Sequence, residues 1–147
     1  MRIEGSRLVR APRAAVWAAL NDPQVLKRVT PGCEQLEAAG ADQYSVTLKV
    51  GVAAIKGTFN GSIHVRDKQE PERFVMDVAA SGTSGWVKMT GQVTLMEQGG
   101  GTLVAYDWDV QIGGAVAAVG QRVVGGVAKL LIDQMFGKVD AVLGGAA

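Results

Sequence analysis

The sequence has few of the residues on which metal and redox chemistry depend. Its 147 residues include one cysteine, Cys33, and one histidine, His64. A single cysteine excludes a disulfide within the chain, and one thiol with one imidazole falls short of the ligand sets that hold zinc or non-haem iron. We therefore expect no metal site. We interpret Cys33 as a small structural residue and place His64 on a solvated strand face.

The sequence also lacks a strong charge bias and long hydrophobic runs. Its net charge is +1 at pH 7, whereas nucleic-acid-binding proteins carry a clustered basic face. The longest wholly apolar run, residues 113–120, is far below the ~20 residues that span a bilayer. The first residues do not have the pattern of a secretory signal peptide, and we expect none. We expect a cytoplasmic protein, and a peripheral position on the inner face of the cytoplasmic membrane is compatible with these features.

What the sequence does contain is a continuous series of strand patterns. Hydrophobic residues make up 48% and charged residues 20% of the chain, which is the balance of a globular protein, and the length suits one domain over residues 1–147. Residues 2–10 predict a strand, Pro12 opens a short helix, and residues 24–28 predict a second helical turn. Six alternating segments then follow with short turns between them, which predicts antiparallel hairpins. These segments are residues 34–39, 44–50, 55–66, 74–80, 87–95 and 104–112.

The last third of the chain predicts one long helix. Residues 113–143 contain no proline and are rich in glycine and alanine. Glycine costs about 1 kcal/mol per helical position relative to alanine, so repeated glycines indicate that a thin helix face is needed. The predicted fold is α+β: a seven-stranded antiparallel sheet wrapped around this C-terminal helix, with two short helices after the first strand. A thin helix over the dry face of the sheet leaves space for an internal cavity.

The inward-facing side chains of this fold are the candidate ligand contacts. Aromatic side chains stack with rings, and methionines adapt to irregular apolar ligands. The candidate cavity residues are Phe59, Met76, Trp86, Met89, Tyr106, Trp108, Val116, Gly120 and Val123. Ordinary core packing stays open as an alternative for each of them.

One end of the predicted sheet gathers turns that are apolar and nearly uncharged. Exposed apolar clusters mark a ligand entrance, a partner site or a membrane surface. The candidate cavity mouth, which is also the candidate membrane or partner contact, consists of Val52, Ala53, Ala54, Trp86, Gly113 and Gly114. The alternative is that these turns fold inward and plug the sheet.

The predicted interior offers little to catalysis. Asp107 and Asp109 share a strand face, but that face is opposite Tyr106 and Trp108 and therefore lies outside the cavity. The glycines of residues 55–61 lack the ending and the strand-to-helix setting of a phosphate loop. We expect no catalytic residue, and we interpret the protein as a non-enzyme.

Several short motifs, spread over almost the entire chain, resemble those of one protein family. They are residues 11–17, Leu20-Asn21-Asp22-Pro23, Pro31-Gly32-Cys33-Glu34, residues 55–61, Gly113-Gly114 and residues 119–122. On these residues the sequence resembles the CoxG family, the G subunits of carbon monoxide dehydrogenase. That family is part of the START and birch-pollen-allergen (SRPBCC) superfamily, which has the helix-grip fold.

The resemblance implies a non-catalytic accessory subunit of a molybdenum hydroxylase of the carbon monoxide dehydrogenase type. It implies a cavity that binds a quinone or another apolar small molecule, no covalent cofactor, and a link between the enzyme, the membrane and the respiratory chain. Some relatives carry a membrane segment after the helix. This chain ends at Ala147, so we expect direct membrane contact to rest on the apolar end. Two rivals stay open: an aromatase/cyclase-like or hydrolase-like enzyme on the same fold, and a ligand-free docking or assembly protein.

Overall fold

Seven strands and a long C-terminal helix make up most of the protein in a computed structural model, which describes residues 1–52 and 55–145. The strands are β1 (Arg2–Val9), β2 (Cys33–Gly40), β3 (Gln43–Val52), β4 (Ile55–Gln69), β5 (Arg73–Gly82), β6 (Gly85–Gln98) and β7 (Gly101–Gly113). The helices are α1 (Arg13–Leu20), α2 (Pro23–Val29), α3 (Ala115–Ala118) and α4 (Gln121–Asp140), and a π-helical turn, η1 (Ala141–Gly145), follows α4. The predicted strands and the two short helices are confirmed.

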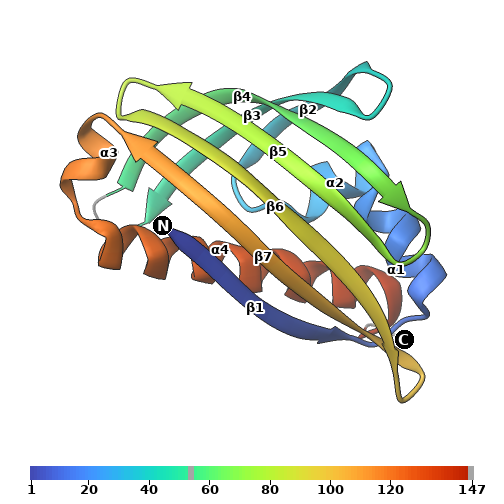
Figure 1. Ribbon diagram of the computed structural model, residues 1–147. Helices are drawn as coiled ribbons and strands as arrows, with labels where there is room; N and C mark the ends of the chain where they lie inside the picture. Colours follow the sequence, from blue (N-terminus) through green and yellow to red (C-terminus); the bar gives the residue numbers. More distant parts are fainter. Residues whose placement is uncertain (53–54, 146–147) are drawn as a thin grey trace.

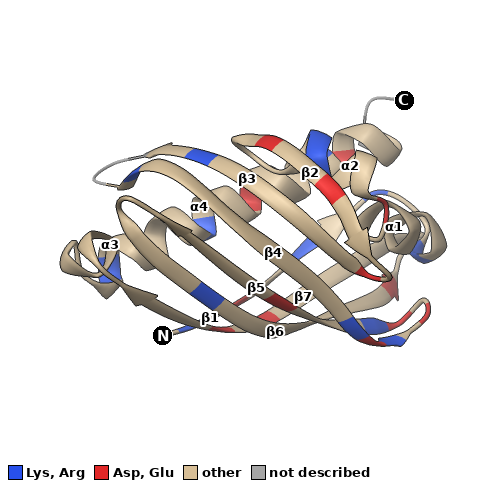
Figure 2. Ribbon diagram, turned by 90° about the horizontal axis from the view of Figure 1, so that it is seen from above, with Lys and Arg blue, Asp and Glu red and all other residues tan. Residues whose placement is uncertain are grey.

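The strands form one antiparallel sheet in the order β1-β7-β6-β5-β4-β3-β2. The sheet curves over α4, and β1 and β2 form its two edges (Figure 1). Side chains alternate between a dry inner face and a wet outer face, as the burial pattern of β7 shows. Basic and acidic residues are interspersed over the outer surface and are sparse at the end that carries α3 (Figure 2).

Two polar contacts fix α4 to the edge of the sheet at β1. The Arg10 guanidinium donates to Asp140 Oδ2 at 2.6 Å, and the backbone N–H of Arg10 donates to Asp140 Oδ1 at 2.7 Å. Arg7 Nη1 donates to the carbonyl oxygen of Asp133 at 2.8 Å. At the other edge α4 packs against α2. These contacts hold the helix across the inner face of the sheet, which determines the space between the two layers.

The prediction of a single helix over residues 113–143 is wrong at its N-terminal end. Gly113 is the last residue of β7, and α3 is separated from α4 by Gly120, whose φ of 93° is outside the helical region. Gly114, with φ of 78°, likewise precedes α3. These two glycines provide backbone conformations that other residues rarely adopt. They end and restart helices and do not thin the face of a continuous one.

Two clusters of buried side chains fill the space between the layers. The larger one includes Phe74, Leu95 and Phe136 and joins the sheet to α1, α2 and α4. The smaller one lies at the α3 end of the molecule and consists of Ile55, Phe59, Val116, Val124 and Val127. This smaller cluster lies near the end of the sheet at which the sequence predicts a cavity mouth.

Candidate ligand cavity

An apolar cavity of about 200 Å³ lies between the inner face of the sheet, α2 and α4. Its lining residues come from α1, α2, the α2–β2 connection, six strands and α4. They are Leu20, Leu26, Thr30, Pro31, Leu36, Leu48, Val50, Ile63, Phe74, Met76, Val78, Met89, Val93, Trp108, Leu131, Ile132, Met135 and Phe136. Among these described residues, only Thr30 and Trp108 carry a polar side-chain group, and none is charged. The cavity can therefore enclose a neutral, hydrophobic molecule.

Several lining residues are partly exposed, in the middle of the sheet as well as near its β2 edge and on α4. Pro31, Leu48 and Val50 on one side, and Leu131 and Met135 of α4 on the other, are half-buried. We take the place where the α2–β2 connection and β3 face the middle of α4 as the candidate entrance. This is a different place from the turns that the sequence predicts as the mouth.

The Pro31-Gly32 motif shapes this entrance. Gly32 has φ of 73°, its carbonyl accepts a hydrogen bond from Lys49 N at 2.8 Å, and a Cβ at Gly32 would collide with Lys49 O. Only glycine fits such a position without strain. The tight connection places Pro31 against β3, at the rim of the cavity.

Glycines on neighbouring strands set the positions of three aromatic rings. Tyr106 pairs with Gly5, Trp108 with Gly91, and Trp86 with Gly113. In each pair, a Cβ on the glycine would collide with the aromatic ring. Each ring therefore lies over its glycine on the next strand. Tyr106 leans towards β1, whereas Trp108 leans towards β6 and reaches the cavity.

Trp108 carries a polar group that the protein leaves unpaired. The residue is 5% exposed, and its indole Nε1–H is buried with no hydrogen-bond partner among the described residues. An unsatisfied buried donor costs about 1–3 kcal/mol. Native proteins rarely leave such groups without a partner, so this donor is a distinguishing feature of the lining.

Three of the predicted cavity residues, Met76, Met89 and Trp108, line this cavity. Tyr106 is buried beside it, with its ring centroid 5.2 Å from Trp108 and 6.0 Å from Phe136. Burial, together with the charge of Asp133, raises the pKa of the Tyr106 phenol, which keeps it protonated.

The remaining predicted cavity residues do not line this cavity. Phe59 and Val116 belong to the smaller buried cluster at the α3 end. Trp86 lies on the outer face, 40% exposed, with Lys88 Nζ 5.8 Å from its ring centroid. Gly120 is exposed, with open space where a Cβ would stand. Val123 is 40% exposed.

The predicted mouth residues lie around turns that pack together. Gly113 lies beneath the Trp86 ring, and Gly114 packs against Gly85, where a Cβ would be 2.7 Å from the Gly85 Cα. Val52 ends β3, and Ala53 and Ala54 lie outside the described residues.

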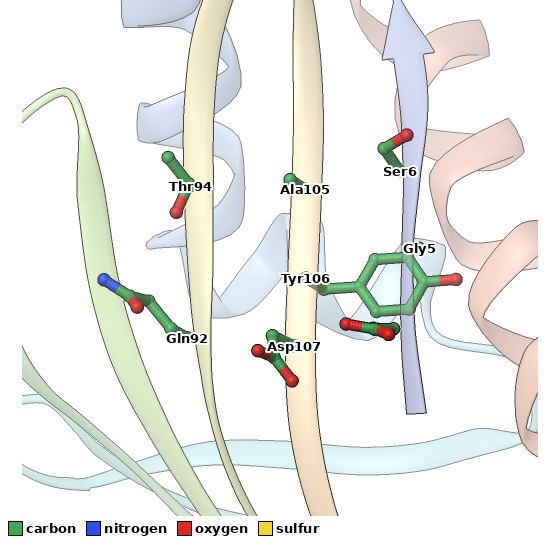
Figure 3. A pocket seen from close by; sticks show the side chains of 8 residues that line it. Gly5, Ser6, Gln92, Thr94, Ala105, Tyr106 and Asp107 are labelled. Carbon is green, nitrogen blue, oxygen red and sulfur yellow. The ribbon is translucent and has the colours of Figure 1, made fainter. Parts of the chain in front are cut away.

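The outer face of the sheet holds a shallow hollow of about 350 Å³ over β1, β7 and β6. Figure 3 shows the Tyr106 ring beside Gly5, with Ser6, Gln92 and Asp107 around the hollow. Asp107 accepts two hydrogen bonds from the Arg2 guanidinium, at 2.8 and 2.6 Å, which lower the pKa of its carboxyl. A carboxylate held in this way does not supply a proton near neutral pH.

The described residues show no alternative chemical centre. Within residues 1–52 and 55–145, no three His, Cys, Asp or Glu side chains are arranged to hold a metal ion. Partial burial raises the pKa of the Cys33 thiol, whose Sγ donates to Gln35 O at 3.4 Å, so it is not an activated nucleophile. None of the described helices is long and apolar enough to cross a membrane.

A curved antiparallel sheet around a long helix, with an apolar cavity between them, defines the START-like helix-grip class. A START superfamily protein from Mycobacterium smegmatis superimposes with a TM-score of 0.77 at 11% identity, covering 99% of both chains. A protein from Chromobacterium violaceum gives 0.74 at 16% identity, covering 97% of this chain and 96% of its own. At these identities the likeness concerns the fold alone.

Two closer matches show the family to which this chain belongs. A conserved protein from Geobacillus kaustophilus is 36% identical, with a TM-score of 0.92, over 95% of this chain and 93% of its own. The family model of CoxG, the G subunit of carbon monoxide dehydrogenase, matches residues 5–144. The chain therefore belongs to the CoxG family. No protein of curated function matches it.

Proposed function

We propose that this chain is an accessory subunit that binds a quinone for a molybdenum hydroxylase of the carbon monoxide dehydrogenase type and links that enzyme to the membrane. Family membership supports an accessory role beside this class of enzyme. The observation that carries the ligand proposal is the cavity lining, in which described apolar side chains are interrupted only by Thr30 and Trp108. With no charged group in that lining, the cavity stores a ligand and performs no acid–base chemistry on it.

The cavity volume determines which part of the ligand is enclosed. An apolar cavity of ~150 Å³ engineered in another protein binds benzene, so about 200 Å³ accommodates one ring. Burying a ring of roughly 150–250 Å² contributes about 4–6 kcal/mol at ~25 cal/mol per Å². Association itself costs an estimated 4–15 kcal/mol. A quinone ring alone therefore binds weakly.

The tail must supply the remaining affinity, at about 0.8 kcal/mol per buried CH₂. It would leave through the entrance between Val50 and Leu131, where the half-buried side chains are apolar. Beyond the entrance, Leu130 of α4 is among the exposed large hydrophobic residues. A quinone bound with its ring in the cavity and its tail across the entrance could exchange between the protein and a bilayer. This mode of binding suits a carrier.

Filling the cavity tests the proposal. Val78 lines the cavity, whereas Val75 is on the same strand and its side chain is on the outer face. We expect Val78→Phe to weaken binding of decylubiquinone, a benzoquinone with a ten-carbon tail, at least tenfold in a fluorescence titration. Val75→Phe provides the matched control and should bind like the parent. Thermal melts establish that both variants are folded, and unchanged binding by a folded Val78→Phe would contradict the proposal.

A further inference from the structure

Among the described residues that line the cavity, Trp108 is the only one with an indole N–H, and that N–H is buried without a hydrogen-bond partner. A Cβ at Gly91 would collide with Trp108 Cδ1, the atom bonded to Nε1, so this edge of the indole lies over β6. The inner-face residues on either side of Gly91 are Met89 and Val93, both of which line the cavity. No acceptor among the described residues lies in hydrogen-bonding geometry with this N–H group.

The indole is also held in place. Its ring edge lies over the backbone of β6 at Gly91, and the Tyr106 ring is at a centroid distance of 5.2 Å and an angle of 39°. A donor fixed in this way loses little conformational freedom when an acceptor arrives.

A water molecule is a poor partner for this donor. A buried water needs two to four polar partners. The other polar side chain of the lining, Thr30, belongs to the α2–β2 connection and not to β6 or β7. A ligand that brings its own acceptor, and fills the apolar space at the same time, satisfies the donor better.

We infer that the Trp108 Nε1–H donates a hydrogen bond to a neutral acceptor oxygen of the ligand, of the kind that a ring carbonyl provides. The inference rests on the proposed function and deepens it by naming the group that recognises the ligand. An anionic headgroup is disfavoured at this position, because no cation lines the described cavity and an unpaired buried charge is costly. The site therefore selects a quinone or another neutral ketone over a fatty acid.

The test uses nuclear magnetic resonance and two probes. The three tryptophans give three indole N–H signals, and the signal missing from Trp108→Phe is that of Trp108. We expect decylubiquinone to move this signal downfield in the wild-type protein, as a new hydrogen bond does. Decylbenzene, which has the tail and a ring but no oxygen, should fill the cavity without that downfield shift.

Binding constants give a second, independent readout. Removing one neutral hydrogen bond should weaken decylubiquinone binding by Trp108→Phe roughly 3- to 10-fold and leave decylbenzene binding nearly unchanged. Trp86→Phe, which alters an exposed indole outside the cavity, should change neither. If decylubiquinone binds but the Trp108 signal stays in place, the inference is overturned and the proposed function stands. If neither probe binds the wild-type protein, both fail. The signal shift is measured on the wild-type protein, and should Trp108→Phe fail to fold, the Trp108 signal is assigned from its nuclear Overhauser contacts with the neighbouring Tyr106 ring.

Discussion

Gly91→Ala offers a sharp test of how the cavity wall is built. A Cβ at this position would be 2.6 Å from Trp108 Cα and would collide with Trp108 Cδ1 and Asp107 O. The indole must leave its place over β6, and β6 and β7 must also separate locally, because Asp107 O and Trp108 Cα are backbone atoms. Overpacking of this kind costs about 1–3 kcal/mol. For a chain of this size, 1 kcal/mol shifts Tm by roughly 2–4 °C, so we expect Tm to fall by about 2–12 °C and decylubiquinone binding to weaken.

Two further comparisons show whether contact with the Trp108 indole causes the loss of stability in Gly91→Ala. Gly126→Ala is the matched control, because Gly126 is within α4 and has open space at its Cβ; it should gain up to about 1 kcal/mol. Gly91→Ala should also cost less in a Trp108→Ala background than alone, since contacting residues are not additive. Calorimetry on the parent, Gly91→Ala, Trp108→Ala and the double variant gives the coupling free energy between the two positions. A Gly91→Ala protein as stable as the parent, or strictly additive costs, would refute this account of the Trp108 position.

Three other predictions concern α4 and its attachment. Gly120→Ala should lower Tm, because φ of 93° strains any residue with a side chain; an unchanged Tm would mean that the helix break is not required. Val124→Ala should cost about 1–2 kcal/mol and Val123→Ala nearly nothing in urea unfolding, since Val124 is 7% exposed and Val123 40%; equal costs would contradict the helix register. The hydrogen bonds from Arg10 lower the pKa of the Asp140 carboxyl in the folded protein. Their contribution to the free energy of unfolding is therefore fully present above the unfolded pKa of about 3.9, and it is lost as the pH falls through the lower pKa of the folded state. Asp140→Asn should therefore be less stable than the parent at pH 7 and approach it towards pH 2, and a gap that persists in acid would count against this pair.

The strands could be predicted from the sequence because their signal is local. Alternation with a period of two identifies the inner face of each strand, and short turns make consecutive strands neighbours. The α4 register could not be obtained in this way. In a helix continuous from Gly113, the spacing of Val116, Val119 and Val123 places Val123 on the inner face. The break at Gly120 restarts the helix with Val124 inward.

The cavity could be predicted only in part, because its contents depend on contacts between strands. Parity places Trp108 and Tyr106 on the same inner face, yet the rings lean in opposite directions because Gly91 and Gly5 are on different neighbouring strands. Assigning these glycines to rings requires the strand register. The rim residues Thr30 and Pro31 lie in a motif that the sequence shows clearly, but their place at the entrance depends on where the α2–β2 connection meets β3.

The central claim is that the CoxG-family cavity carries a quinone for a partner enzyme. The most direct measurement is mass spectrometry of lipids extracted from the protein purified natively, without added ligand. The account predicts a quinone in the extract, and a Val78→Phe protein purified in the same way should contain much less of it. A natively purified protein that contains no quinone and still binds the hydroxylase would contradict the account and support a docking protein with an empty cavity.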